Sequence, residues 1–277
     1  MRTPLVTAVM AARDAADTIA EAIDAVLGQT LRDLELLVVD DGSQDATADV
    51  VRGFDDPRVH LLQTTGVGRG AARNLALGQA RGRYIGITDA DDISLPERFE
   101  RQATVMEGAP ELAVLGAQIL DFGHWGGPRP GYRMPVGVRA VAARLAEGQT
   151  PVQHQACVLR RDVVLAAGGY AAECLRCQDL ELMLRLRDHP MDNVPDVLLH
   201  YRTAAPEPSW PYWRENARYR RYAVVRAQAV LEGRRPPTFE EFARRSFWCS
   251  PSGTALERGR HLGDRARRRL RPAGVQL

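Results

Sequence analysis

The stretch Arg83–Glu97 reads RYIGITDADDISLPE, and it joins the pattern of a buried strand directly to a cluster of acids. Its first part, Tyr84–Thr88, is an apolar run with one small glycine, as in a strand covered on both faces. Asp89, Asp91 and Asp92 then follow within four positions. Three carboxylates this close repel one another unless a cation or hydrogen-bond donors neutralise them. The stretch therefore predicts a buried strand that ends at a divalent-cation site or at the acidic start of a helix.

Strand and helix patterns alternate on the N-terminal side of this stretch. Apolar runs predict strands, and amphipathic stretches with capping residues predict helices. The strands are expected at Leu5–Met10, Leu34–Val39 and Val59–Gln63, and the helices from an N-cap at Asp17 to Leu27, from Ser43 to about Phe54, and over Ala71–Gln79. This order predicts right-handed crossovers and a parallel sheet, with a nucleotide-sized crevice at the carboxyl ends of the strands.

A second acidic pair, Asp40-Asp41, also lies where a predicted strand ends. Because the carboxyl ends of parallel strands meet at one edge of a sheet, both acidic groups are expected at that edge. Ser43 alone would explain the start of a helix, whereas a carboxylate here could also face the imide of a nucleobase. The glycine-rich turn Gly66–Gly70 and then Arg73 follow the next strand, and backbone amides with a guanidinium suit a diphosphate.

The chain after Pro96 has a less regular pattern. Helices are expected at Glu97–Glu107, Gln178–Asp188, Trp210–Glu232 and Phe239–Trp248, strands near Leu112–Leu120, His154–Leu159 and Val194–Leu199, and a loop over Phe122–Pro135. The predicted fold class is α/β, with a mostly parallel central sheet, helices on both faces and a helical C-terminal extension. Residues 1–205 are expected to form the main domain and residues 206–277 the extension, which ends in an arginine-rich tail at Arg258–Arg271.

The composition limits the classes of function. The chain has 277 residues, a hydrophobic fraction of 45% and a net charge of +2, which is typical of a globular protein and gives no case for nucleic-acid binding. No lysine occurs, so mechanisms that need one are excluded. Cys174 and Cys177 are the only close pair of cysteines, and without a second pair they do not indicate a zinc site.

No stretch of the sequence predicts a membrane span or a signal peptide. No apolar run approaches the roughly 20 residues that cross a bilayer, and the N-terminus leads directly into a strand pattern. We therefore expect a cytoplasmic protein. The arginine-rich tail is expected to be a solvated end, with peripheral contact to an acidic membrane surface as the alternative.

Five segments, in their order, resemble glycosyltransferase family 2. They read LVTAVMAARDAADTIAEAIDAVLGQT (5–30), LELLVVDDGSQDAT (34–47), GVGRGAARNLALGQARGRYIGITDADD (66–92), VLRRDVVLAAGGY (158–170) and CQDLELMLRL (177–186). The resemblance covers roughly residues 3–202 and implies the GT-A nucleotide-diphospho-sugar fold. It implies a nucleotide-sugar-binding half at residues 1–95, an acceptor-binding and catalytic half at residues 96–205, and Mg²⁺ or Mn²⁺ as the cofactor.

The resemblance also implies roles for single residues. Asp41 would contact the nucleobase with support from Asp40, and Arg73 would approach the base or the phosphates. Asp89 would lie near the ribose, and Asp91 would bind the metal as the second acid of a DXD motif. As a whole, the implied donor site comprises Ala11, Arg13, Asp40, Asp41, Arg73, Asp89, Ala90 and Asp91.

Asp179 falls where this family keeps its catalytic base. From the residues alone it is an acid in the first turn of a helix, a position that lowers a carboxyl pKa. A general base benefits from a raised pKa, so burial or the nearby Glu181 would have to offset the helix dipole.

The sequence departs from the family pattern at three places. Arg13 replaces a tyrosine that commonly stacks near the base, and Gln178 replaces the glutamate of a Glu-Asp pair. The histidine that often follows Tyr-Arg and completes the metal site is missing after Arg202, although a histidine lies just upstream. The further candidate site residues are Asp92, His154, Glu181, His200 and Arg202, among which His154 is expected to be structural.

The leading prediction is an inverting glycosyltransferase. It would use a nucleoside-diphosphate sugar, with UDP as the favoured nucleotide, and an acceptor that could be a glycan, glycolipid, natural product or peptide. A non-catalytic nucleotide-sugar-binding protein is the first alternative, because of the altered first-strand motif and the missing histidine. A sugar nucleotidyltransferase is less favoured, because such enzymes usually rely on a lysine and this chain has none.

Overall fold

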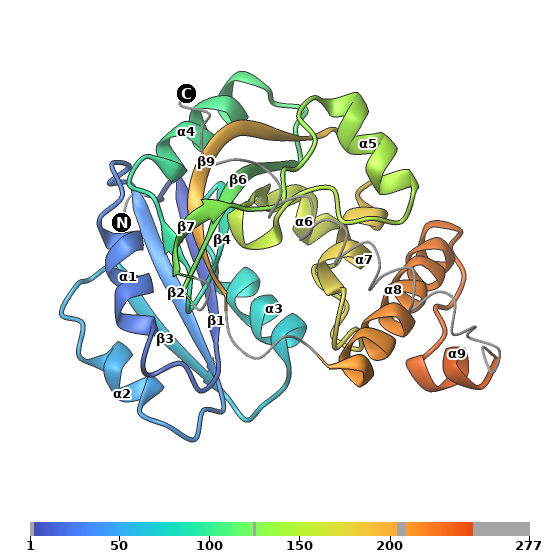
Figure 1. Ribbon diagram of the computed structural model, residues 1–277, viewed down its shortest axis with the longest axis horizontal. Helices are drawn as coiled ribbons and strands as arrows, with labels where there is room; N and C mark the ends of the chain where they lie inside the picture. Colours follow the sequence, from blue (N-terminus) through green and yellow to red (C-terminus); the bar gives the residue numbers. More distant parts are fainter. Residues whose placement is uncertain (1–2, 124–125, 204–208, 246–277) are drawn as a thin grey trace.

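The computed structural model describes residues 3–123, 126–203 and 209–245 (Figure 1). Within them, nine strands form one mixed sheet in the order β3-β2-β1-β4-β8-β6-β9-β5, with β7 paired to β6. The strands are β1 (Val6–Ala12), β2 (Leu34–Asp41), β3 (Val59–Thr64), β4 (Tyr84–Asp89), β5 (Ile93–Ser94), β6 (Val114–Gly123), β7 (Gly126–Pro130), β8 (Val158–Arg160) and β9 (Met191–Thr203). The helices are α1 (Ile19–Leu27), α2 (Thr47–Arg52), α3 (Arg69–Gln79), α4 (Arg98–Gly108), α5 (Val138–Ala146), α6 (Arg161–Ala166), α7 (Gln178–Arg185), α8 (Trp210–Leu231) and α9 (Phe239–Arg245).

The N-terminal half of the sheet is parallel. β1 pairs in parallel with β2 and with β4, and β2 pairs in parallel with β3, so these four strands end at one edge. β8 is antiparallel to both β4 and β6, and β9 runs parallel to β6. The predicted α/β class with a largely parallel sheet is confirmed.

Alternate residues of the central strands face two separate cores. In β1, Val6, Ala8 and Met10 pack with residues of α1 and α4, whereas Val9 packs with residues of α3 and α7. Successive side chains of a strand point to opposite faces, so a strand covered on both faces is apolar throughout. Figure 1 shows α1 and α2 on one side of the sheet and α3 on the other, as predicted.

Several element boundaries differ from the expected ones. α1 begins at Ile19 with Thr18 rather than Asp17 at its N-cap, and no side chain caps it. The expected loop after Phe122 contains the strand β7, which pairs with β6. Its glycines and prolines indicated a loop, but a strand at the margin of a sheet tolerates both residues. α5 has no expected counterpart. Its short, alanine-rich sequence buries only two apolar side chains, which gives too weak a periodicity to predict a helix.

The expected strand at His154–Leu159 is a 3₁₀ turn, His154–Ala156, followed by the short β8. The division at residue 205 falls among residues 204–208, outside the described part, and it stays a prediction. The arginine-rich tail also lies outside the described residues. No helix within those residues is both long enough and apolar enough to span a membrane.

A buried ion-pair network fastens α8 to α7. Glu181 of α7 is fully buried and accepts hydrogen bonds from Arg185, at 2.8 Å, and from Arg226 of α8. Beside this network, Tyr222 of α8 packs with Phe242 of α9 in a third, smaller core. The two C-terminal helices therefore dock on the main sheet domain through α7.

Glu181→Gln is expected to lower the free energy of unfolding by about 2 kcal/mol. Removing one partner of a buried ion pair costs roughly 3–5 kcal/mol, but both guanidinium groups keep other acceptors here. Glu173→Gln removes only the exposed partner of Arg226 and should cost less than ~1 kcal/mol. Urea denaturation measures both losses, and equal losses would contradict a special role for the buried carboxylate.

Candidate active site

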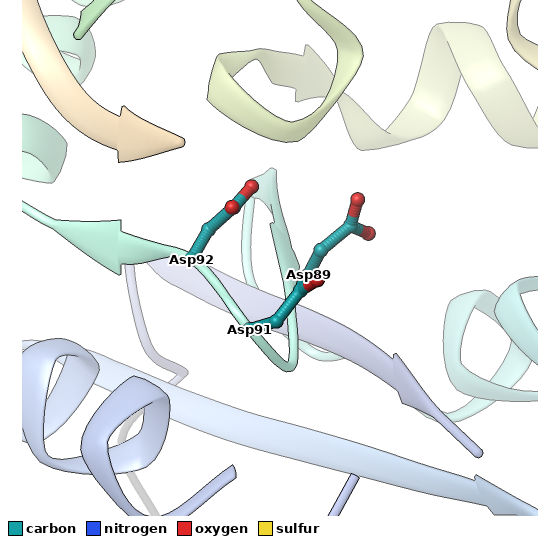
Figure 2. A group of neighbouring side chains, drawn as sticks. All are labelled: Asp89, Asp91 and Asp92. Carbon is teal, nitrogen blue, oxygen red and sulfur yellow. The ribbon is translucent and has the colours of Figure 1, made fainter. Parts of the chain in front are cut away.

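The acidic turn, Asp89–Asp92, joins the end of β4 to the start of β5. One carboxylate oxygen each of Asp89, Asp91 and Asp92 can be chosen so that all three lie within 4.8 Å of one another. Figure 2 shows Asp89 and Asp92 projecting to the same side of this turn. The register of the sheet also sets Ala11 opposite Asp89 and Ala12 opposite Asp40. The structure thus brings both predicted acidic groups to one edge of the sheet.

The neighbouring arginines do not fully compensate the carboxylates of the acidic turn. Burial, followed by the charge of Asp89, raises the pKa of Asp92 to about 8. The pKa of Asp91 is also raised, because the neighbouring chain removes part of the solvent around its carboxylate and Asp89 repels it, although the residue as a whole is exposed at the surface. Asp92 Oδ1 accepts the backbone N–H of Arg202 at 2.8 Å, while its buried Oδ2 has no hydrogen-bond partner among the described residues. Burying an unpaired carboxylate oxygen is unfavourable, so the turn is suited to bind a cation.

Asp41 organises the glycine-rich loop. Its carboxylate accepts the hydroxyl of Thr64 at 2.5 Å and the backbone N–H groups of Val67 and Gly68 at 2.7 and 2.8 Å. Gly68 has a φ of 91°, which favours glycine because a Cβ is strained there. Asp41 is therefore bound to its own chain, and these two amides are occupied rather than open to a diphosphate.

Asp40 and Arg13 flank this loop. Asp40 accepts the backbone N–H of Ser43 at 3.1 Å and the side-chain amide of Gln63 at 3.3 Å. Arg13 is exposed, and its Nη1 lies 3.3 Å from the position that a Cβ on Gly66 would take. Arg13 thus lies against the glycine-rich loop.

Arg73 lies behind the acidic turn and is nearly buried. Its Nη2 donates to Asp89 Oδ1 at 3.1 Å, and its guanidinium lies 5.8 Å from the centre of the Tyr170 ring. The hydroxyl of Tyr170 is 2.8 Å from His154 Nε2. Burial and the charge of Arg73 keep the pKa of His154 well below its usual value, so His154 is neutral. His154 therefore contacts Tyr170, whose ring lies against Arg73, and its expected structural role stays a prediction.

Asp179 occupies the first turn of α7. Cys177, the N-cap residue that precedes α7, has a left-handed φ of 56°, a strained value for a residue other than glycine. Burial raises the pKa of Asp179, and it outweighs the opposing backbone N–H of Leu180 and the charges of Arg73 and Arg220. A raised pKa is the condition that a general base in this position requires.

Two arginines near the site escape the sequence-based prediction. Burial raises the pKa of Asp91 and of Asp179, and the positive charges of Arg69 and Arg220 offset a small part of that rise at Asp91 and Asp179, respectively. Arg69 stands four residues before Arg73 in α3, so helical spacing could have placed both on one face. Arg220 belongs to α8, and no local pattern indicates that this helix reaches Asp179.

The remaining candidates have different surroundings. Glu181 is bound to two arginines in the α7–α8 interface. His200 pairs with Ile93 across β9 and β5, and it is not a member of the acidic ligand group found among the described residues. Arg202 donates from Nε to the carbonyl of Asp91 at 2.8 Å, so it helps to shape the acidic turn.

Sequence comparison identifies relatives of this chain. Residues 7–168 match the sequence model of glycosyl transferase family 2. The amylovoran biosynthesis glycosyltransferase AmsE of Erwinia amylovora is 32% identical over 194 residues, which are 68% of this chain and 72% of that relative. The Escherichia coli UDP-Glc:alpha-D-GlcNAc-diphosphoundecaprenol beta-1,3-glucosyltransferase WfgD is 43% identical over 104 residues, 37% of this chain and 41% of that relative.

Solved structures share the fold. Staphylococcus aureus TarS 1–349 in complex with UDP has a TM-score of 0.62 and 17% identity, with 94% of this chain and 78% of that chain covered. The mannosyltransferase PcManGT from Pyrobaculum calidifontis, in complex with GDP-Man and Mn²⁺, has a TM-score of 0.59 and 20% identity, with 99% and 77% covered. Since the family match spans more than half of the chain and the fold agrees with it, this protein belongs to glycosyl transferase family 2 and is a glycosyltransferase.

Proposed function

We propose that this family member is an inverting glycosyltransferase that moves a sugar from a UDP-sugar to an acceptor nucleophile. One arrangement supports the proposal: Arg73 bonds to Asp89 of the acidic turn, and its positive charge also acts on Asp179. A diphosphate attracted to Arg73 would lie between the acidic turn and the candidate base. The UDP-Glc named for WfgD and the UDP bound to TarS support the choice of nucleotide.

Asp179 would act as the general base. It would take a proton from the acceptor nucleophile as that atom attacks the anomeric carbon on the face opposite the diphosphate. The new bond forms at this carbon while its bond to the diphosphate oxygen breaks, and the electron pair leaves with that oxygen. Arg73 would stabilise the charge that develops on the leaving group. Because attack and departure occur on opposite faces, the configuration of the sugar inverts.

The acidic turn fits a divalent cation, Mg²⁺ or Mn²⁺. It offers three carboxylates, one of which has a buried oxygen without a partner among the described residues. Asp91 would bind the ion together with Asp89 and Asp92, because hard cations prefer such oxygen ligands. The cation, when bound, supplies positive charge next to the diphosphate. The Mn²⁺ in the PcManGT complex supports this assignment.

We propose a sugar-containing acceptor that approaches from the side of α8. WfgD is named for action on alpha-D-GlcNAc-diphosphoundecaprenol, and AmsE for amylovoran biosynthesis. Exposed Leu175 lies 3.9 Å from the position that a Cβ on Gly68 would take, and the guanidinium of Arg176 lies 4.4 Å from the ring centre of exposed Tyr212. An apolar and aromatic wall with one cation suits a sugar ring and its polar substituents.

A thermal-shift panel tests the donor. UDP-, GDP- and dTDP-sugars are added at one equal concentration, about 100 times the Kd expected for the UDP-sugar, with and without Mn²⁺. The UDP-sugar with Mn²⁺ is expected to raise Tm by about 5–10 °C, because saturating ligand stabilises the folded state by ~2.7 kcal/mol. A larger shift with GDP- or dTDP-sugars would overturn the choice of UDP. The absence of any shift would overturn the donor site itself.

A further inference from the structure

The acidic turn rests on a buried arginine. Arg98, the first residue of α4, is fully buried in the sheet domain. Its Nη1 donates to Ser94 Oγ at 2.9 Å, and its Nη2 donates to the carbonyl oxygens of Ile87 at 2.5 Å and Cys157 at 3.3 Å. Its Nε donates to Gln102 Oε1 at 3.2 Å. One guanidinium thus joins α4 to three other segments of the chain.

Two of these acceptors bracket the acidic turn. Ile87 lies in β4, two residues before Asp89, and Ser94 lies in β5, two residues after Asp92. The planar fork of the guanidinium therefore sets the distance between the two limbs of the turn. A single ammonium group cannot span both acceptors in the same geometry.

Gln102 extends this network to the neighbouring strands. Its Nε2 donates to the carbonyl of Leu115 in β6 at 3.0 Å and to the carbonyl of Ala156, just before β8, at 2.9 Å. Arg98 and Gln102 thereby connect the end of β4 and the start of β5, on either side of the acidic turn, to the middle of the sheet. This connection gives the acidic turn a rigid support even though it is itself a loop.

Arg98 also carries a charge without a direct partner. Among the described residues, no carboxylate lies within salt-bridge distance of its guanidinium, although the charges of Asp92 and Asp89 act on it. Burial lowers its pKa to about 10, which leaves it protonated at neutral pH. A buried, unpaired cation is unfavourable for folding alone. Its position behind the acidic turn lets its positive charge reduce the repulsion among the three carboxylates.

We infer that Arg98 is a positioning residue for the glycosyltransferase reaction, which fixes the two limbs of the acidic turn and supplies a permanent positive charge behind it. The turn would then keep its arrangement before any cation or donor binds. The role of Arg98 in holding the acidic turn does not depend on the proposed function. Its effect on metal or donor binding does rest on that function.

Hydrogen exchange in the metal-free, full-length protein tests the inference directly. Arg98→Lys keeps the charge and removes the fork. Amides of residues 89–94 are expected to exchange at least 10-fold faster in this variant than in the wild type. The matched control is Glu35→Gln, which weakens a separate network with Thr7 and Arg81, near the amino ends of β1 and β2. It should leave this exchange within twofold.

Mn²⁺ affinity, measured by electron paramagnetic resonance, provides the second readout. Arg98→Lys is expected to weaken Mn²⁺ binding at least 10-fold, and Glu35→Gln to leave it within twofold. If Arg98→Lys does not fold, Ser94→Ala removes a single acceptor and should change both readouts about threefold in the same direction. Unchanged exchange and affinity in a folded variant would reduce Arg98 to a structural residue. A wild-type protein that binds no Mn²⁺ would overturn the proposed metal site, while the exchange experiment would still decide the role of Arg98.

Discussion

Asp179→Asn is expected to lower kcat for sugar transfer about 1000-fold, within the range that general-base catalysis contributes. The amide has nearly the same size and cannot accept the proton of the acceptor nucleophile. Donor binding should change less than threefold, because the amide keeps the size of the carboxylate and Asp179 is not a member of the acidic ligand group of the described residues. Steady-state kinetics gives kcat, and calorimetric titration of the UDP-sugar gives the donor Kd.

Asp188→Asn provides the matched control for this variant. It makes the same chemical change at an exposed carboxylate just beyond the C-terminal end of α7, and kcat should stay within twofold of the wild type. If Asp179→Asn kept most of its turnover, another group would be the base. If it lost donor binding and turnover together, Asp179 would belong to the donor site.

The pH dependence gives an independent check on Asp179. Burial raises its pKa above the ordinary value of 3.8, and a general base acts only when it is ionised. The kcat/KM of the wild type should therefore fall as the pH drops through this raised pKa and level off above it. The residual activity of Asp179→Asn should lack this acid limb, since the amide does not titrate.

The apolar runs of β1 to β4 made most of the fold predictable. β1, β2 and β4 are buried along almost their whole length, so their sequences are predominantly apolar, and α1 and α3 show amphipathic spacing. α5 and β7 escaped prediction because their stability comes from tertiary contacts. Val141 and Leu145 are the only buried side chains of α5, and β7 pairs with β6.

The location of a candidate site residue was predictable only where the order and direction of the strands determine it. Acids at the carboxyl ends of parallel strands must lie at one edge of the sheet, which placed Asp40 and Asp89 at the same edge, on either side of β1. The partners of Asp41 were not predictable, because the amides that it binds lie 26 and 27 residues further along the chain. Arg98 directly follows a Pro-Glu pair at a helix start, where sequence predicts an exposed side chain, and only the tertiary structure shows its burial.

Asp91→Ala is expected to lower kcat/KM in the presence of Mn²⁺ by about 100-fold and to remove most of the difference between assays with and without EDTA. The reason is electrostatic: a bound cation stabilises transferring diphosphate by several kcal/mol, and the variant loses one of the three carboxylates that would bind it. Asp91 is exposed, so the fold should tolerate alanine with little change in Tm.

Glu97→Ala separates metal binding from a general loss of negative charge. Glu97 is exposed and lies six residues after Asp91, outside the acidic ligand group of the described residues. This control should keep both kcat/KM and its sensitivity to EDTA within twofold of the wild type. If Asp91→Ala retained metal-dependent activity, Asp89 and Asp92 would suffice as ligands, and Asp91 would not be the metal-binding acid of the turn. If neither the wild type nor the variant responded to EDTA, no metal would take part, and Arg73 and Arg69 would have to neutralise the diphosphate by themselves. The raised pKa values of Asp91 and Asp92 would then reflect only burial and repulsion among the carboxylates, not an ion site.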